Sequence, residues 1–422
     1  MPQVTQSSNT TATYVLQGVD KTVIRDRIKA EMEDKFSVTS ERLDFPLIFW
    51  NAKFHKDPIK FRPIAGSREK VLYPLEQIVG KIMKMITNHF IAYCRVNERQ
   101  TGIKYYFAIK NSIEMKNVLN DLNGKAQRFD SYDFSNLYTN FKHEEILERL
   151  YWLIDLMFGN SKKNLIIINK NLRKAEYADV AIDSEIGWTF TIDKLKEAIR
   201  FLISNTYVEF GNLLLKQNKG IPMGSIPAPD FANLALAVDE YKYVKNMISI
   251  SNYRITRKLN KMCRYLDDIG IPNFQEFGDI TDIYPSTLTL TRSNDSGLVD
   301  IAFLDLSVNV INKKFETKIY CKTDDYSFSV ISLPFLDSNV AAEMCYSVYS
   351  GQVLRFLRVC SKLEDFRERT VFLTRMLQGR SYSNVRLASK INQVLCKHKK
   401  DWSKFAALIK VKEFMVSVVY RV

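Results

Sequence analysis

The sequence lacks the features of a membrane protein, a disulfide-stabilised protein or a zinc protein. No apolar run approaches the ~18–20 residues of a membrane span. The N-terminus has no charged-then-apolar signal pattern. The six cysteines contain no Cys-x-x-Cys pair, and the four histidines are scattered away from them, which argues against a disulfide framework and a zinc site. We therefore expect an intracellular protein, in the nucleus or the cytoplasm, without a membrane partner.

What the sequence does contain is a globular composition with an uneven positive charge. The 422 residues are 46% hydrophobic and 26% charged, with a net charge of +14, and this length allows two or three subdomains. From Gly351 to Val422 there are 16 Lys and Arg against 5 Asp and Glu, a balance of +11. Such a segment is typical of a surface that binds a nucleic-acid backbone; the alternative is a basic surface that only confers solubility.

The stretch Arg264-Tyr265-Leu266-Asp267-Asp268 places two adjacent carboxylates between apolar residues. Apolar residues on both sides favour a β-hairpin with Asp267 and Asp268 at or near its tip. Two neighbouring carboxylates repel each other unless a cation neutralises them, and oxygen ligands suit Mg²⁺, which also binds substrate phosphates. The stretch indicates a metal site for phosphoryl transfer; the alternative is an exposed Asp-Asp turn.

A third carboxylate is found at Asp133, which follows an aromatic-rich strand start, and Tyr138 lies five residues later. A carboxylate on a strand is what a two-metal site needs beside the Asp-Asp hairpin. A helix cap or a turn is the alternative role for Asp133. Asp130 has the same alternative and is the weaker candidate.

Two further segments have the chemistry to bind a nucleotide. Residues 49–65 form an expected hairpin, with a turn at Asp57-Pro58, and carry Lys53 and Arg62, which can neutralise phosphate oxygens. Residues 219–229 contain two glycines and three prolines, which predicts a rigid loop whose backbone can approach a ligand closely. A solvated hairpin and a structural connector are the respective alternatives.

The remaining pattern predicts an α+β fold, with antiparallel strands backed by helices. We expect a polar N-terminal tail over residues 1–12 and basic helices from about residue 339 onwards. Further helices are expected over residues 20–34, 73–98, 192–205, 230–247 and 274–284. Strands are expected over residues 165–168, 288–290, 299–310 and 317–320, with a short hairpin around Gly211.

In this order the motifs resemble those of reverse transcriptases, and more closely the Penelope-like group, which is related to telomerase. Asp133 with Tyr138, the loop Gly220-Ile221-Pro222-Met223-Gly224-Ser225 and Tyr265-Leu266-Asp267-Asp268 each match a family motif. Arg62-Pro63-Ile64 resembles the fingers motif, Phe303-Leu304-Asp305 the primer-grip region, and the segment from Gly351 to Ser361 the start of the thumb. The loop departs from the family in having Ile226 between its serine and the next proline.

The resemblance implies a right-hand polymerase with fingers, palm and helical thumb. Its expected divisions are an N-terminal tail and helix (1–40), fingers (41–128), a first palm part (129–159), an insertion of fingers or palm (160–219), a second palm part (220–345) and a basic thumb (346–422).

The implied activity is that of a retroelement RNA-directed DNA polymerase, which adds dNTPs to a primer 3′-hydroxyl on an RNA or DNA template-primer. Asp133, Asp267 and Asp268 would hold two Mg²⁺ ions, with Mn²⁺ as the alternative. The implied nucleotide-binding residues are Lys53, Arg62, Tyr138, Gly224 and Ser225. The implied template-primer residues are Pro222, Met223, Tyr265, Phe303, Leu304, Arg355 and Arg358.

Two other functions fit part of the pattern. An RNA-dependent RNA polymerase shares this chemistry, but such enzymes usually place a carboxylate where Tyr138 stands and a glycine before the Asp-Asp pair. A catalytically inactive, nucleic-acid-binding relative is disfavoured by the three aspartates.

Overall fold

A computed structural model describes residues 13–54, 58–66, 70–135, 137–274, 278–293, 300–326, 328 and 330–420. The expected N-terminal tail, and Asp57 of the expected turn, lie outside these residues. The chain divides into two compact units: the first comprises residues 1–108, 133–267 and 275–291, and the second comprises residues 109–132, 268–274 and 292–422. None of the helices in the described ranges is long and apolar enough to cross a membrane.

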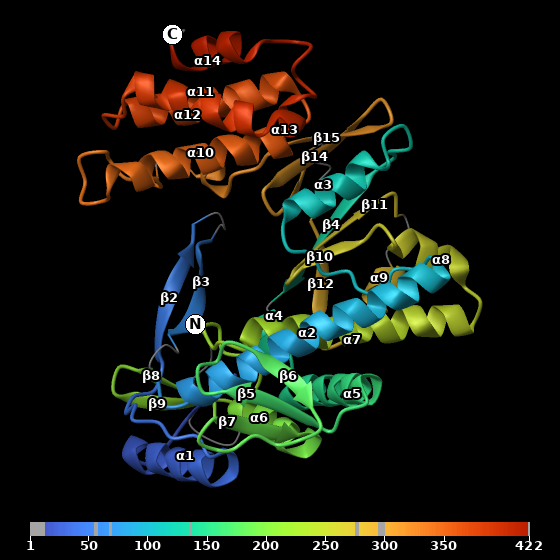
Figure 1. Ribbon diagram of the computed structural model, residues 1–422, viewed down its shortest axis with the longest axis vertical. Coiled ribbons are helices and arrows are strands. Elements are labelled where there is room, and N and C mark those ends of the chain that lie inside the picture. The colour runs from blue at the N-terminus through green and yellow to red at the C-terminus, as the bar shows by residue number, and fades with distance from the viewer. Residues whose placement is uncertain are drawn as a thin grey trace. The chain divides into compact units, whose positions relative to one another are not determined.

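Helices predominate in the first unit, and α2 is the longest of them (Figure 1). The helices are α1 (Lys21–Phe36), α2 (Tyr73–Thr101), α4 (Leu137–Asn140), α5 (His143–Ser161), α6 (Ile192–Ser204), α7 (Ala228–Ser249), α8 (Tyr253–Leu259) and α9 (Gly278–Thr281). The buried side chains of α2 recur every three or four residues, as expected for one helix face packed on a core. Pro74 lies in the first turn, where its missing N–H is tolerated, and the expected helix over 73–98 is confirmed.

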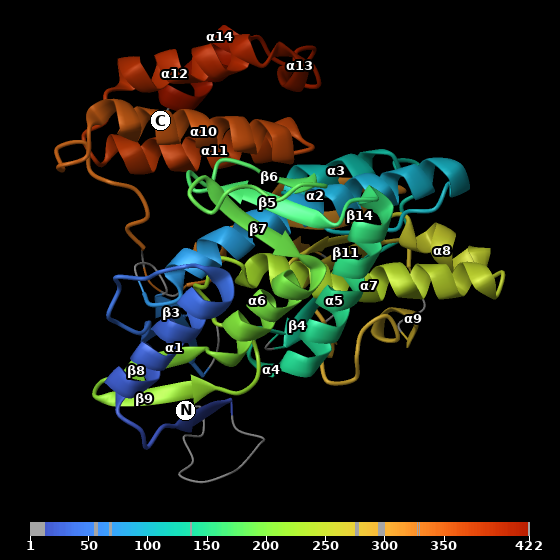
Figure 2. The ribbon, with the colours of Figure 1, turned by 60° about the horizontal axis from the view of Figure 1, so that its bottom comes forward.

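Two sheets accompany these helices in the first unit. The five-stranded sheet has the order β1 (Tyr14–Leu16), β9 (Leu213–Gln217), β8 (Tyr207–Phe210), β2 (Leu47–Lys53) and β3 (Lys60–Gly66). The smaller sheet has the order β6 (Ala175–Ala178), β5 (Leu165–Asn169) and β7 (Gly187–Thr191), and it packs against α2 and α6 (Figure 2). The expected hairpin around Gly211 is confirmed by the pairing of β8 with β9.

A four-stranded sheet has the order β10 (Cys263–Tyr265), β11 (Asp268–Pro272), β4 (Phe129–Ser135) and β12 (Thr289–Arg292). These strands carry Asp133 and the predicted Asp-Asp hairpin, so both expectations of local structure are confirmed. The residues of β4 up to Tyr132 are assigned to the second unit and the rest to the first.

The second unit contains a sheet of β13 (Ile301–Phe303), β14 (Leu306–Ile311) and β15 (Lys314–Ile319). Its helices are α3 (Ser112–Asn120), the 3₁₀ helix Lys322–Asp325, α10 (Ala342–Val359), α11 (Leu363–Gln378), α12 (Asn384–Lys397), α13 (Lys399–Trp402) and α14 (Val411–Val419). Helix α10 packs on α11 and α12, and α14 packs on the same two helices (Figure 1). Aromatic rings fill this core; Phe366 stacks on Phe414 with ring centroids 4.8 Å apart.

Two expectations about local structure are wrong. The single strand over 299–310 is instead the hairpin β13–β14, which reverses at Leu304 and Asp305. Leu304 adopts a φ of 55°, a conformation that a leucine signals poorly because glycine and asparagine usually supply it. The described part of the expected helix over 274–284 is helical only in α9.

Candidate active site

The segments that carry Asp133 and Asp267 lie side by side. The first four residues of β4 are buried, whereas Asp133 is exposed between the buried side chains of Tyr132 and Phe134. The backbone N–H of Phe134 donates to the carbonyl oxygen of Asp267 at 3.1 Å. Asp267 lies in the two-residue turn between β10 and β11, and Asp268 opens β11. The structure therefore brings together the backbone of the first two predicted carboxylates, and the third follows directly in the chain.

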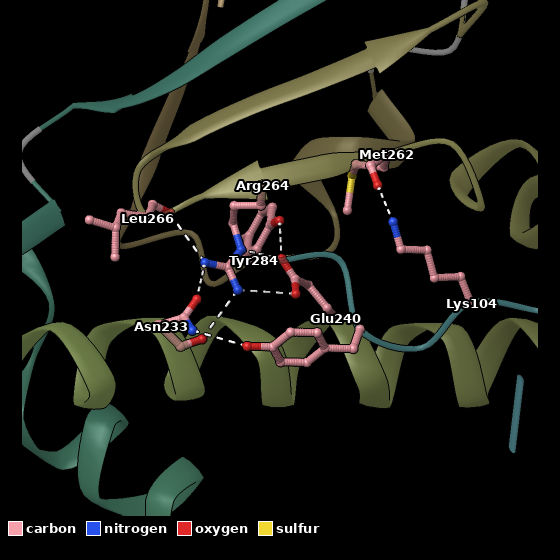
Figure 3. A network of polar contacts seen from close by, with 8 residues as sticks. Lys104, Asn233, Glu240, Met262, Arg264, Leu266 and Tyr284 are labelled. Atoms are coloured by element: carbon pink, nitrogen blue, oxygen red, sulfur yellow. Dashed lines mark hydrogen bonds and ion pairs between the residues drawn. The ribbon is translucent and has the colours of Figure 1, made fainter. Parts of the chain in front are cut away.

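The turn at Asp267 has an unusual backbone conformation and accepts a hydrogen bond from a buried arginine. Leu266 has a φ of 53°, which costs a non-glycine residue about 1–2 kcal/mol. The Leu266 carbonyl accepts a hydrogen bond from Arg264 Nη1 at 3.3 Å (Figure 3). Arg264 is completely buried and pairs with Glu240, with 2.5 Å between Nε and Oε1. Tyr265, which lies between Arg264 and Leu266 in the chain, is 36% exposed.

Tyr138, on the short helix α4, is electrostatically coupled to the same turn. The pKa of Tyr138 is raised to about 12, first by burial and then by the Asp267 carboxylate, while Arg264 and Arg62 act in the opposite direction. The hydroxyl therefore stays neutral near pH 7. These couplings place Tyr138 in the field of Asp267 and Arg62, two of the residues predicted to share its site.

The loop Gly220–Ser225, which precedes α7, lies against the backbones of both α4 and β3. A Cβ at Gly220 would lie 2.2 Å from the carbonyl oxygen of Tyr138, and a Cβ at Gly224 would lie 1.8 Å from that of Ala65. Gly220 and Gly224 have φ angles of +83° and +122°, which favour glycine. The N–H of Ala65 also donates to the carbonyl of Met223 at 2.8 Å. The loop can approach these two backbones only because it has glycine at both positions.

The serine of this loop is bound by a buried acid. Ser225 Oγ donates to Glu76 Oε1 at 2.7 Å, and the N–H of Ile226 donates to Glu76 Oε2 at 3.4 Å. Burial raises the pKa of Glu76 to about 7, although both hydrogen bonds lower it. Within the loop, Pro222 is half-buried and its carbonyl accepts from the N–H of Ser225 at 3.2 Å. The Ser225 hydroxyl thus has a structural partner that the sequence did not indicate.

The cavity beside Glu76 is too small for a nucleotide. Its volume is about 30 Å³, and its lining includes Phe45, Val71 and Tyr207. This volume corresponds to about one water molecule. This cavity is therefore not a candidate nucleotide site.

The β2–β3 hairpin has two chemically different faces. Its register pairs Lys53 with Lys60 and Asn51 with Arg62, and directly paired residues share a face of the hairpin. The predicted phosphate-binding residues Lys53 and Arg62 therefore lie on one face. The next residues along the strands, which include Phe61 at 61% exposure, lie on the opposite face.

The predicted primer-grip residues belong to the second unit and have mixed exposure. Phe303 is 1% exposed, and its ring packs edge-on against Phe129 with centroids 6.2 Å apart. A Cβ at Gly270 would lie 3.0 Å from the same ring. Leu304 is half-buried in the turn that follows. Phe303 is therefore a core residue, and Leu304 is the more accessible of the two.

Both predicted thumb arginines form ion pairs within the second unit. Arg355 Nε lies 2.5 Å from Asp305 Oδ2, and Arg358 Nε lies 3.0 Å from Asp401 Oδ2. The first pair joins α10 to the β13–β14 turn. All four side chains keep some solvent exposure, so a phosphate oxygen could compete with the carboxylates for the guanidinium groups.

Asp130, the weaker carboxylate candidate, is a structural residue. It is fully buried and pairs with Arg128 at 2.7 Å and with Arg292. A buried carboxylate is retained when cationic partners offset its desolvation.

Asp133 and Asp267 offer carboxylate oxygens, which are the kind of ligand that Mg²⁺ binds. Within the ranges that the structure describes, no three side chains of His, Cys, Asp or Glu converge as a metal site. Mg²⁺ does not require such a cage, because it usually binds one or two carboxylates together with substrate phosphates and water. The oxygen donors of Asp133 and Asp267, on neighbouring backbone segments, fit that chemistry.

Sequence reasoning missed the polar residues that support the site from within the core. Glu76, Asn233, Glu240 and Tyr284 contact either the loop serine or Arg264. One signal was present: Asn233 and Glu240 are seven residues apart in α7, whose other residues between them are mostly apolar and buried. Two polar residues on the same face of such a helix indicate a buried partner.

No family model and no curated protein match the chain. Among solved structures, it is similar to telomerase from Candida albicans in complex with a fragment of telomeric RNA, with a TM-score of 0.51 and 13% identity over 94% of this chain. It spans 62% of that chain.

Two other solved structures have lower TM-scores. Apo telomerase from Candida tropicalis gives a TM-score of 0.44, with 12% identity over 96% of this chain and 75% of that one. The BmCPV RNA-dependent RNA polymerase at elongation state gives 0.42, with 10% identity over 79% of this chain and 26% of that one. From the similarity to the Candida albicans structure, the chain has a polymerase-like fold.

Proposed function

We propose that the chain is an RNA-directed DNA polymerase that adds dNTPs to a primer 3′-hydroxyl. The observation that carries the proposal is the hydrogen bond between Phe134 N–H and the Asp267 carbonyl, because it aligns the backbone of two predicted catalytic carboxylates within a polymerase-like fold. In this reading the β2–β3 hairpin belongs to the fingers, β4 and β10–β12 to the palm, and α10–α14 to the thumb. The Penelope-like affiliation rests on the sequence motifs.

In the proposed reaction, two bound Mg²⁺ ions would activate the primer hydroxyl and stabilise the departing pyrophosphate. Asp133 and Asp267 would hold them, with Asp268 next in the chain. Lys53 and Arg62, on one face of the hairpin, would bind the triphosphate oxygens. Each of these side chains therefore acts by positioning charge rather than by forming a covalent bond.

Tyr138 would select the sugar. Its ring follows Asp133 by five residues, and its hydroxyl remains neutral beside the Asp267 carboxylate. A bulky neutral ring at this position would exclude a 2′-hydroxyl by contact. This role separates the proposed enzyme from an RNA-dependent RNA polymerase.

The basic C-terminal helices would hold the template-primer backbone. Arg355 and Arg358 are paired with Asp305 and Asp401, so phosphate binding would exchange one anionic partner for another. Binding should weaken steeply with salt, because each neutralised phosphate releases counterions.

The test is primer extension on matched RNA and DNA templates with dNTPs or rNTPs, with Asp267→Asn as the control variant. We expect the wild-type protein to extend primers with dNTPs on RNA templates and Asp267→Asn to extend none. Incorporation of rNTPs alone would identify an RNA polymerase instead. Tight binding of template-primer without extension would identify a non-catalytic nucleic-acid-binding protein.

A further inference from the structure

The side chain of Arg264 lies in the core directly behind the Asp267 turn. It is completely buried, and its five N–H groups match five acceptor contacts: Glu240 Oε1 and Oε2, Asn233 Oδ1, and the carbonyl oxygens of Asn233 and Leu266 (Figure 3). Guanidinium has five donors in a fixed planar fork. The surroundings therefore fix both the position and the orientation of this group.

The side-chain partners of Arg264 come from a largely buried helix of the first unit. Asn233 and Glu240 both lie on α7, which is buried along most of its length. Glu240 also accepts a hydrogen bond from the hydroxyl of Tyr284 at 2.9 Å, and the N–H of Arg264 donates to the carbonyl of Phe107 at 2.9 Å. Four of the five acceptors thus belong to the helix, and the fifth, Leu266, belongs to the turn.

The contacts of Arg264 with α7 do not by themselves explain why an arginine stands at this buried position. A buried ion pair seldom stabilises a fold more than well-packed apolar residues of the same volume would, because both charges must be desolvated. What an apolar pair could not supply is the hydrogen bond to the Leu266 carbonyl. That carbonyl belongs to a leucine at a φ of 53°, a conformation that persists only when its surroundings hold it.

We infer that Arg264, held by Glu240 and Asn233 of α7, is a positioning residue that fixes the Leu266–Asp267 turn and thereby the place of the Asp267 carboxylate. The catalytic consequence rests on the proposed function, but the positioning itself does not. The backbone of Asp267 is also bonded to Phe134 beside Asp133, so a displaced turn would separate the two predicted metal ligands.

The test compares three variants, two of which share the substitution Tyr284→Phe and differ only at Arg264 and Glu240. The reference is Tyr284→Phe, which removes one hydroxyl from Glu240 and leaves the contact to Leu266 intact. The second variant adds Arg264→Met and Glu240→Leu to this background, so that no buried charge and no Tyr284 hydroxyl is left without a partner. Arg264→Lys is the third variant, because an ammonium keeps the charge without the planar fork.

Hydrogen exchange of the Phe134 amide is the first readout, because this amide is protected by the Asp267 carbonyl. In the apolar variant we expect exchange at least about tenfold faster than in Tyr284→Phe, at an unfolding midpoint close to that of the reference. The second readout is single-nucleotide addition. A displacement of about 1 Å can cost about 10²-fold in rate, so we expect kcat to fall about 10- to 100-fold with the Kd for template-primer within about twofold.

Equal exchange of the Phe134 amide in the apolar variant and in Tyr284→Phe would overturn the inference. So would equal effects of Tyr284→Phe and the apolar variant relative to wild type, since the hydroxyl does not contact the turn. If Arg264→Lys kept both the wild-type protection of the Phe134 amide and the wild-type rate of nucleotide addition, the positive charge alone would suffice. The positioning role of the planar guanidinium group would then be refuted. A wild-type protein that extends no primer would refute the proposed function, while the exchange result would still decide the positioning.

Discussion

Glu76→Gln tests how the loop Gly220–Ser225 is held. The glutamate accepts hydrogen bonds from Ser225 Oγ and from the N–H of Ile226, and it is 6% exposed. Burial raises its pKa from 4.5 to about 7. The folded protein therefore keeps the proton over a pH range in which the unfolded chain has released it.

The direction of the pH effect follows from this difference. The stability that the protonated carboxyl contributes is fully present below pH 4.5 and is lost as the pH rises through 7. Each pKa unit corresponds to about 1.4 kcal/mol, so the wild-type protein should lose about 2–3 kcal/mol of unfolding free energy between pH 5 and pH 8 through this group. Glutamine has nearly the same shape, keeps one acceptor oxygen for the Ser225 hydroxyl and has no carboxyl proton to release.

The assay is urea-induced unfolding of wild-type protein and Glu76→Gln at pH 5 and pH 8. We expect the variant to gain about 2–3 kcal/mol relative to wild type over this range. The other titrating groups are present in both proteins, so the difference isolates Glu76. Parallel pH profiles would refute the reasoning, and so would a variant that loses stability only at the higher pH.

Further outcomes are expected for the Gly220–Ser225 loop, for Tyr138 and for the Arg355–Asp305 ion pair. Gly224→Ala should lower unfolding free energy by more than about 3 kcal/mol, because its Cβ would overlap a backbone carbonyl 1.8 Å away; Gly66→Ala, in open space, should be close to neutral in the same urea titration. Tyr138→Ala should admit rNTPs in primer extension, and unchanged sugar discrimination would count against its role. Arg355→Gln should weaken template-primer binding and reduce the salt slope by about 1. Asp305→Asn should leave affinity equal or tighter, because it removes the competing carboxylate; a loss as large as that of Arg355→Gln would mean that the ion pair, rather than the arginine, matters.

The strand that carries Asp133 and the hairpin that carries Asp267 could be predicted because their signals are local. The apolar residues on both sides of Asp267 and Asp268 indicate a hairpin, and the aromatic residues before Asp133 indicate a strand. Each pattern lies within a few neighbouring residues. The long helix α2 was predictable for the same reason, since its apolar spacing and Pro74 lie in a continuous segment.

The residues that sequence reasoning missed act through contacts between distant segments. Glu76 and Ser225 are 149 residues apart, and Arg264 and Glu240 are 24 apart, so no local pattern records either pair. The reversal at Leu304 was missed because a leucine at positive φ is held by its surroundings and not by its own preference. Phe303 was likewise read as a primer contact, whereas its burial against Phe129 became visible only in three dimensions.

If Asp133 and Asp267 form one catalytic pair, as we propose, both must be needed for nucleotide addition and neither for template-primer binding. A rate measurement accompanied by a binding measurement on the same samples tests this most directly. Single-turnover addition of one dNTP in the presence of Mg²⁺ would be compared between wild-type protein, Asp133→Asn, Asp267→Asn and Asp130→Asn, with template-primer affinity measured on the same samples. We predict that Asp133→Asn and Asp267→Asn each abolish addition without loss of template-primer affinity. Asp130→Asn, which alters the buried structural carboxylate, should lower the free energy of unfolding. The molecules that remain folded should still add the nucleotide. Addition at the wild-type rate by Asp133→Asn or Asp267→Asn would contradict the claim.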